Sequence, residues 1–182
     1  MTQPITNQKM LKKLFEHLKN KSNRNYLIFK LQLKTASRIS DILKLNFEDI
    51  DTKNGKITIK EKKTGKTKNF IELDKKTLEE LKQYLKQNNI NSGLLFRSRK
   101  KGGIISRIQA YRILKKISNI LNLANVGTHT IRKTTAFFLY ENTKNISLVM
   151  KLLNHSSEAT TLLYLGITQN KINKNLQVLF NF

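Results

Sequence analysis

Few residues in this chain would end a helix. Its single proline, Pro4, lies near the N-terminus, and only 7 glycines are spread over 182 residues. Because proline and glycine are the strongest breakers of helices, long stretches can stay helical. Apolar residues recur every three or four positions through most of the chain, as at Met10, Leu14 and Leu18. This period predicts a mainly α-helical fold.

One segment follows a different period. Ile57 and Ile59 alternate with polar residues, "KTGK" follows, and apolar residues resume at 70–73. This pattern predicts a β-hairpin near residues 55–73, with Gly65 in its loop. We expect an α+β, mainly α-helical single domain over 1–182, with this hairpin as a small antiparallel sheet and a short strand with a basic loop at 91–103. Helices are predicted at 7–20, 23–33, directly after "TASR", and at 75–88, 106–122, 130–142, 145–153, 157–163 and 168–179.

The charge indicates a polyanionic partner. The chain holds 35 lysines and arginines against 12 acids, a formal net charge of +23. Between Leu81 and Tyr140 there is no acid at all, but there are twelve basic residues. Such a charge opposes compaction through self-repulsion, so a polyanionic partner such as double-stranded DNA is the natural explanation. The alternative is a lysine-rich protein from an AT-rich genome, since lysine, asparagine and isoleucine are all abundant.

Several classes of protein are disfavoured. Cysteine is absent, so disulfides, thiolate metal sites and cysteine nucleophiles are excluded, which fits a reducing interior. No stretch is apolar enough to cross a membrane, and the first residues show no signal-peptide pattern. "EDID" (residues 48–51) is the only dense acidic group, and a solvated turn accounts for it better than a metal site.

Three motifs suit phosphate chemistry, although each also has an ordinary structural interpretation. In "HTIRKT", His129 and Arg132 lie three residues apart and share a helix face. In "TASRISDI", Arg38 precedes Asp41 by one turn, so the carboxylate could orient the guanidinium. In "KEKKTGKTK", five lysines surround the hairpin loop. Taken singly, a surface arginine, an i, i+3 ion pair or a solvated charge run explains each motif as well.

The segment "LLNHSSEATTLLY" is the most distinctive. It places His155 nine residues before Tyr164. Ser156 or Ser157 can cap a short helix that has Glu158 in its first turn. The tyrosine then falls at the end of that helix. A tyrosine packed in the core with a hydrogen-bonded hydroxyl is the alternative.

Read together and in chain order, these motifs resemble those of the tyrosine recombinases of the phage-integrase type. "TASRISDI" is similar to the family's "TGLRISEL" box, "KKTGK" to its hairpin lysine, "HTIRKT" to "HxLRHT", and "LLNHSSEATTLLY" to "LLGHSSxxTTxxY". The resemblance spans about residues 4–170. It implies an active site whose residues are Arg38, Lys63, His129, Arg132, His155 and Tyr164.

The resemblance also implies the chemistry. Tyr164 would attack a DNA phosphodiester and form a 3′-phosphotyrosyl link, with no metal and no cofactor. Two arginines would stabilise the transition state, while a hairpin lysine would donate the proton that the leaving 5′-oxygen needs. Lys63 directly precedes the Thr-Gly turn and is preferred to Lys62. The resemblance further implies a cytoplasmic, nucleoid-associated protein that is encoded by a bacterium, phage or plasmid. It also implies self-association on DNA as a tetramer.

The sequence departs from the family pattern at several positions. Ala36 and Asn154 stand where glycine is usual, Ser37 where leucine is usual, and Lys133 where many members have a second histidine. We expect the family's N-terminal DNA-clamping domain to be absent. The apolar residues of 168–182 predict a C-terminal helix that is either exchanged between subunits or docked on its own core. Two other functions stay open: a catalytically idle DNA-binding module, and a relaxing enzyme like the type IB topoisomerases.

Overall fold

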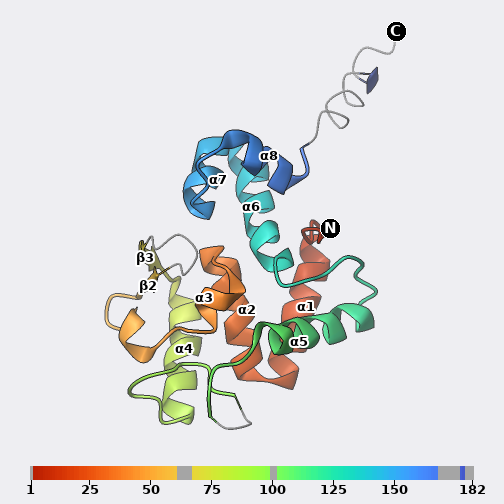
Figure 1. Ribbon diagram of the computed structural model, residues 1–182. Coiled ribbons are helices and arrows are strands. Elements are labelled where there is room, and N and C mark those ends of the chain that lie inside the picture. Colours follow the sequence, from red (N-terminus) through yellow and green to blue (C-terminus); the bar gives the residue numbers. More distant parts are fainter. Residues whose placement is uncertain (1, 61–66, 99–101, 168–176, 179–182) are drawn as a thin grey trace.

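The computed structural model describes residues 2–60, 67–98, 102–167 and 177–178 (Figure 1). Within them the chain is mainly helical and carries one small sheet, as the sequence predicts. The elements, in order, are α1 (Gln8–Lys21), α2 (Asn23–Thr35), α3 (Ile39–Ile42), η1 (Phe47–Asp49), β1 (Ile50–Asp51), β2 (Lys56–Lys60), β3 (Thr67–Glu72), α4 (Lys75–Gln87), α5 (Arg107–Ile120), α6 (Thr130–Thr143), α7 (Ile146–Leu153) and α8 (Glu158–Leu165).

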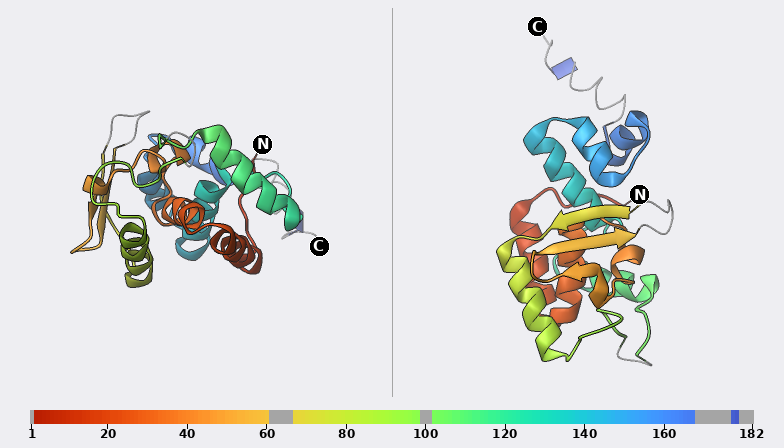
Figure 2. Two further views of the ribbon diagram at one scale, coloured as in Figure 1. Left: turned by 90° about the horizontal axis from the view of Figure 1, so that it is seen from below. Right: turned by 90° about the vertical axis from the view of Figure 1, so that its left-hand side faces the viewer.

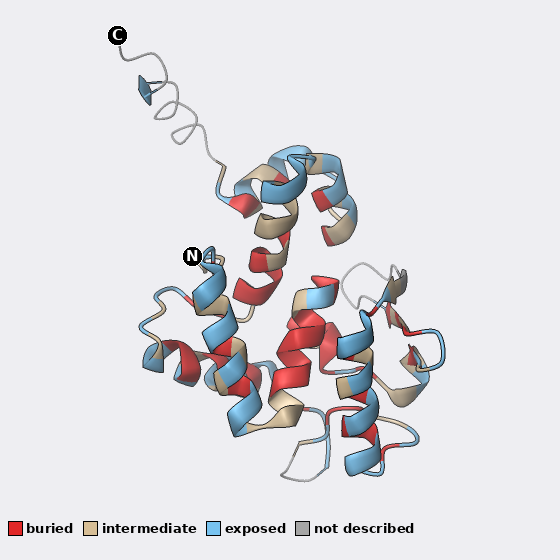
Figure 3. Cartoon of the chain, turned by 180° about the vertical axis from the view of Figure 1, so that it is seen from behind, coloured by how far each residue is buried: buried red, intermediate tan, exposed pale blue. Residues whose placement is uncertain are grey.

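Helix α2 is the centre of the main core. It is buried from Tyr26 to Gln32, the red stretch at the middle of Figure 3. The sequence "YLIFKLQL" explains this burial, because a helix that is apolar on most sides needs neighbours all around it. Those neighbours are α1, α3, α4 and α6. The C-terminal end of α2 leads directly into "ASR", so the core fixes the place of Arg38.

The predicted hairpin is confirmed. Strands β2 and β3 pair antiparallel, with Ile57 opposite Ile71 and a register shift between Ile57 and Ile59. The short β1 adds a third strand beside β2, which gives the order β1-β2-β3 (Figure 2, right). Both isoleucines of β2 are buried in the main core. Lys62 and Lys63 fall in 61–66, outside the described residues.

Two predicted elements are not found in the described residues. The strand expected within 91–103 is wrong: the described residues of this stretch form only isolated bridges, Asn46 with Leu94 and Arg97 with Ile104. Leu95 and Phe96 between them are buried, so apolar content there reflects core packing rather than strand pairing. The helix expected at 168–179 lies almost wholly outside the described residues. No described helix has the length and apolarity needed to cross a membrane.

A polar cluster ties α2 to α4 and α1. Glu80 accepts hydrogen bonds from Lys19 at 2.9 Å and from the hydroxyl of Tyr26 at 3.0 Å, and it pairs with Lys30. Burial opposes the negative charge of Glu80, but hydrogen bonds from Lys30, Lys19 and Tyr26 outweigh burial and lower its pKa. The glutamate therefore compensates a lysine that is almost fully buried.

Replacing this glutamate should weaken the core measurably. Glu80→Gln leaves the Lys30 ammonium largely buried without a counter-charge, so we expect a loss of about 2 kcal/mol in unfolding free energy. Because the folded-state pKa lies below the ordinary value of 4.5, the contribution is present above that pH and fades as pH falls through the folded-state pKa. Urea titration at neutral pH measures it. Glu16→Gln, in an exposed i, i+4 pair, is the control and should cost under about 0.5 kcal/mol; equal losses in both variants would contradict the prediction.

Helices α6, α7 and α8 form a second, smaller packing unit above the main core (Figure 1). The first half of α6 is buried against α2, and its second half carries α7 and α8. A small apolar cluster holds the three helices together and joins them to the end of α2. Its buried members are Ala36, Ala136, Val149, Leu153 and Leu165.

The two positions where glycine is usual have left-handed backbones. Ala36, the C-cap of α2, has φ +48°, and Asn154, the C-cap of α7, has φ +53°. Glycine adopts this conformation without strain, and asparagine tolerates it better than other residues. The backbone therefore explains why asparagine can occupy position 154, directly before His155.

Asn154 offers a direct stability test. Asn154→Ala should lower the free energy of unfolding by about 1 kcal/mol. Alanine has a Cβ but no polar side chain to compensate for the left-handed backbone at this position, so it is strained there. Asn154→Gly should be as stable as the parent or slightly more stable. Asn119→Ala, at an exposed position inside α5, is the control and should be neutral or mildly stabilising. Thermal unfolding decides, and an unaffected Asn154→Ala would refute the strain.

Candidate active site

Arg132 lies at the centre of the candidate site. It is only 2% exposed, on the first turn of α6. Its Nη1 donates to the carbonyl oxygen of Ala36 at 2.6 Å, and its Nη2 donates to the carbonyl oxygen of Leu153 at 2.8 Å. One guanidinium thus joins the segment before Arg38 to the segment before His155. Residues far apart in sequence are held together by this side chain.

Gln32 makes a second link of the same kind. Its buried Nε2 donates to the carbonyl oxygen of Thr128 at 3.1 Å and, more weakly, to that of Ser37 at 3.4 Å. These carbonyls belong to the residues directly before His129 and Arg38. A polar residue in the middle of an apolar helix therefore aligns two loops of the site. The sequence motifs gave no sign of this role.

Arg38 stands at the N-cap of α3, half-buried, with extended backbone. It borders an open hollow of about 590 Å³ together with Ser40, Lys44 and Arg107. Its charge adds to the lowering of the His129 pKa and opposes the rise of the Tyr164 pKa, so it lies near both groups. Asp41, one turn on, is buried, and Ser40 Oγ donates to its Oδ1 at 3.3 Å. That Asp41 orients Arg38 stays a prediction.

His155 and Tyr164 are brought together by a turn between α7 and α8. Ser157 caps α8 by accepting a hydrogen bond from the backbone of Thr160, which confirms one of the two predicted caps. The helix then carries Tyr164 back toward His155, and the two rings meet edge to face with centroids 5.4 Å apart and an interplanar angle of 85°. His155 Nδ1 lies 3.1 Å from Thr161 Oγ1. The nine-residue spacing therefore produces a ring contact.

The phenol of Tyr164 is buried close to positive charge. Its hydroxyl is buried and makes no hydrogen bond of regular geometry. Burial raises the pKa of Tyr164, while the guanidiniums of Arg132 and Arg38 act in the opposite direction. Positive charge therefore already stands where a phenolate would need it.

His129 occupies the N-cap position of α6, with an exposed edge. Partial desolvation and the positive charges of Arg132, Arg38 and Arg107 lower its pKa. This lowering favours the neutral imidazole, the form that is able to accept a proton. The structure brings together five of the six predicted residues, since Lys63 lies outside the described part of the chain.

Two cations that the motifs did not mark as functional also belong to this neighbourhood. Arg107 faces the same hollow as Arg38, and its charge reaches His129. Lys133 lines a second hollow of about 320 Å³ with His129 and Tyr164. The acid-free stretch from Leu81 to Tyr140 contains both and was the available signal. Their positions, however, depend on packing that the sequence does not display.

The acidic residues at 48–51 lie on η1 and β1, just before the turn at 52–55, so the predicted turn falls slightly later in the chain. Asp51 accepts hydrogen bonds from the backbones of Lys53 and Asn54, both at 3.0 Å, and Asn46 donates to Asp49 at 2.8 Å. Glu48 accepts from the backbone of Gly93 at 3.1 Å. Among the residues that the structure describes, no three histidine or carboxylate side chains are grouped as a metal site would require.

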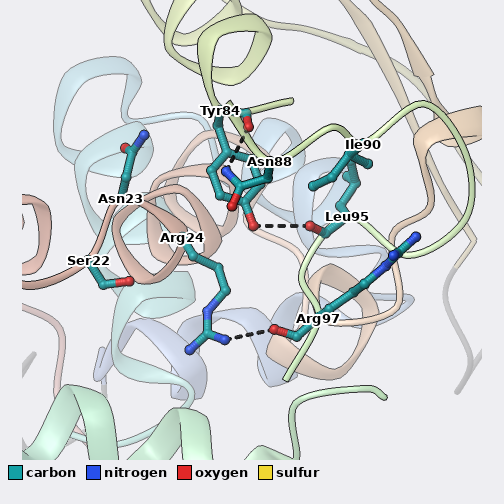
Figure 4. Close-up of a pocket in the computed structure, with 8 residues that line it drawn as sticks. All are labelled: Ser22, Asn23, Arg24, Tyr84, Asn88, Ile90, Leu95 and Arg97. Atoms are coloured by element: carbon teal, nitrogen blue, oxygen red, sulfur yellow. Dashed lines mark hydrogen bonds between the residues drawn. The ribbon is translucent and has the colours of Figure 1, made fainter. Parts of the chain in front are cut away.

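A further hollow of about 350 Å³ lies at the opposite end of α2 (Figure 4). It contains two arginines, but both are engaged by the protein. Arg24 donates to the carbonyl oxygen of Arg97 at 2.7 Å, and Arg97 donates to that of Ser92 at 3.3 Å. Tyr84 donates its hydroxyl to the carbonyl oxygen of Leu95 at 3.2 Å. This hollow is therefore explained by the packing of the 88–97 loop.

Two guanidiniums, two imidazoles and a buried phenol thus lie around Arg132, a set of groups typical of enzymes that act on phosphate esters. The comparisons with known proteins agree with this class. The phage integrase family model matches residues 5–171, and the chain belongs to this family.

Three relatives illustrate the extent of the similarity. The probable integrase/recombinase YoeC of Bacillus subtilis is 36% identical over 170 residues, covering 93% of this chain and 92% of that protein. The tyrosine recombinase XerA of Pyrococcus furiosus is 30% identical over 169 residues, covering 92% of this chain and 58% of the relative. The crystal structure of XerH bound to a palindromic difH substrate, a post-cleavage complex, has a TM-score of 0.77 at 25% identity, covering 97% of this chain and 53% of that one.

These lengths differ in an informative way. The chain matches nearly all of YoeC but spans only about half of the XerA and XerH chains. The similarity therefore establishes the family and the fold of this domain.

Proposed function

We propose that this domain cuts and rejoins DNA strands through a covalent tyrosine intermediate, as a site-specific recombinase or integrase. The single observation that carries the proposal is the environment of Tyr164: a buried phenol close to two guanidiniums from separate segments. A phenol needs positive charge to act as a nucleophile near pH 7, because its ordinary pKa is about 10.

The proposed reaction is a transesterification. The Tyr164 oxygen forms a bond to phosphorus, and the bond from phosphorus to the 5′-oxygen breaks, leaving a 3′-phosphotyrosyl link and a free 5′-hydroxyl. The phenol proton passes to His129 or His155, and the leaving oxygen takes a proton from Lys63. Attack by the 5′-hydroxyl of another strand reverses the step. Because one ester replaces another, no energy-supplying nucleotide is required.

Arg38 and Arg132 are assigned to the two non-bridging phosphate oxygens. Charge grows on these oxygens in the transition state, and donors that are already fixed stabilise it without reorganising. The carbonyl oxygens of Ala36 and Leu153 already hold the guanidinium of Arg132, so it is fixed before phosphate binds. Asp41 is assigned to holding the segment of Arg38.

The proposed partner is double-stranded DNA, with a net charge of +23 to attract it. We further propose that copies of the protein assemble on DNA as a tetramer, and that the C-terminal residues 168–182 contribute to that assembly. The proposed location of the protein is the cytoplasm of a bacterial cell, where the chromosome, plasmid or phage DNA lies.

Trapping the intermediate tests this function. A pool of short random-sequence duplexes is nicked just beyond each candidate position, so that the 5′-hydroxyl fragment diffuses away after cleavage and religation stops. We expect a DNA-linked protein band on a denaturing gel, unaffected by a chelator, with Tyr164 as the linked residue in mass spectrometry. Absence of any adduct would favour the idle DNA-binding module. Relaxation of supercoils without joining of two sites would favour the topoisomerase alternative.

A further inference from the structure

Lys133 is a buried cation beside the proposed nucleophile. It follows Arg132 on α6, is 7% exposed, and borders the same hollow as His129 and Tyr164. Its Nζ lies 4.9 Å from the centroid of the Tyr164 ring. Ammonium groups within about 6 Å of an aromatic face are attracted to it, and the attraction grows when water is excluded.

No acidic side chain in the described part of the chain pairs with Lys133. Burial alone acts on this side chain and lowers its pKa, with no carboxylate to restore it. A buried charge without a counter-charge is costly, so such groups usually meet a specific need. Among the described residues, the group that attracts the Lys133 ammonium is the ring of Tyr164.

The tyrosine ring is thus held from two directions. His155 contacts it edge to face at 5.4 Å, and Lys133 approaches it with an ammonium. Tyr164 needs such contacts because it lies on the last turn of α8, two residues before Gly166, whose backbone is left-handed. A nucleophile at the end of a short helix loses rate if its side chain moves out of line.

Resting on the proposed function, we propose that Lys133 is a positioning residue that holds the ring of Tyr164 in its docked place for attack. It acts through the ring rather than on the phosphorus or the leaving group. No new bond is formed by Lys133, and the proton transfers stay with the residues already named.

The test compares variants at this position on a nicked duplex recovered from the trapping pool. Lys133→Met, which keeps the length but removes the charge, should slow formation of the covalent adduct by about three- to thirty-fold without changing DNA affinity. Lys133→Arg should restore most of the rate, because guanidinium also binds aromatic faces. Lys86→Met, at an exposed position on α4, is the matched control with parental rate. Parental rate in Lys133→Met would overturn the proposal.

A second substrate separates positioning from proton donation. If the bridging 5′-oxygen is replaced by sulfur, the leaving thiolate needs no proton. The defect of Lys133→Met should persist on this substrate. Rescue to the parental rate would mean that Lys133 serves the leaving group, and that result would overturn the positioning role.

A measurement without DNA keeps the two proposals distinguishable. In protein labelled with fluorotyrosine, the Tyr164 signal is assigned by its loss in Tyr164→Phe. This signal should move toward that of an exposed tyrosine in Lys133→Met and stay in place in Lys133→Arg. An unmoved signal in Lys133→Met rejects the docking role even if recombination is real. A moved signal with no covalent adduct in the parent rejects the function while docking stands.

Discussion

Tyr164→Phe should form no covalent DNA adduct at all, while binding the same duplex within about twofold of the parent. The substitution removes one oxygen, and in the proposed reaction that oxygen forms the only new bond to phosphorus. The ring remains, so its contacts with His155 and Lys133 remain too. The expected result is therefore a complete loss of chemistry with an intact site.

The same variant should be at least as stable as the parent. The hydroxyl of Tyr164 is buried and makes no hydrogen bond of regular geometry, so its removal costs only a weak interaction with Arg132. We expect the unfolding free energy to be unchanged or higher by about 1 kcal/mol. A nucleophile that costs stability is typical of a group selected for reaction rather than packing.

Tyr140→Phe is the matched control. Tyr140 lies on α6 and also carries a lysine near its ring, since Lys144 Nζ is 5.6 Å from the centroid. This variant should form the adduct at the parental rate. Denaturing gels measure the adduct, and gel shift measures affinity. An adduct that persists in Tyr164→Phe would show that another residue attacks, and the proposed function would fall with it.

The sequence indicated the elements well where one physical pattern dominates. The alternation at Ile57 and Ile59 predicted the paired strands. The three- to four-residue period predicted the bounds of seven described α-helices to within about two residues, and it predicted α3 without bounds. The prediction failed at 91–103, because Leu95 and Phe96 are apolar for the sake of core packing and not strand pairing. A short apolar run does not distinguish these two causes.

The site was predictable by residue type but not by arrangement. Motif resemblance selected Arg38, His129, Arg132, His155 and Tyr164, and the structure gathers all five. The forces that gather them involve backbone carbonyls, of Ala36 and Leu153 for Arg132 and of Thr128 for Gln32. Every residue has such a carbonyl, so nothing in the sequence marks which ones a side chain will find.

Arg132 both holds two backbone segments together and is the proposed donor to the phosphate, so its replacement should affect stability and rate. Arg132→Met should lower the free energy of unfolding by about 3–5 kcal/mol, because it leaves two buried carbonyls without donors and each costs about 1–3 kcal/mol. It should also slow adduct formation by more than about 10³-fold, since a fixed transition-state donor is lost. Arg132→Lys keeps the charge but not the fork of donors, so it should recover only part of the stability.

Arg38→Met provides the comparison that separates structure from chemistry. Arg38 is half-buried at the edge of an open hollow, and its loss should slow the reaction by about 10²-fold or more with a stability change near 1 kcal/mol or less. Urea titration and adduct formation, both measured below the unfolding transition of the weakest variant, give the two numbers for each arginine. If Arg132→Met proved as stable as Arg38→Met, the two carbonyl contacts would not hold the segments together. The convergence of the site would then need another cause.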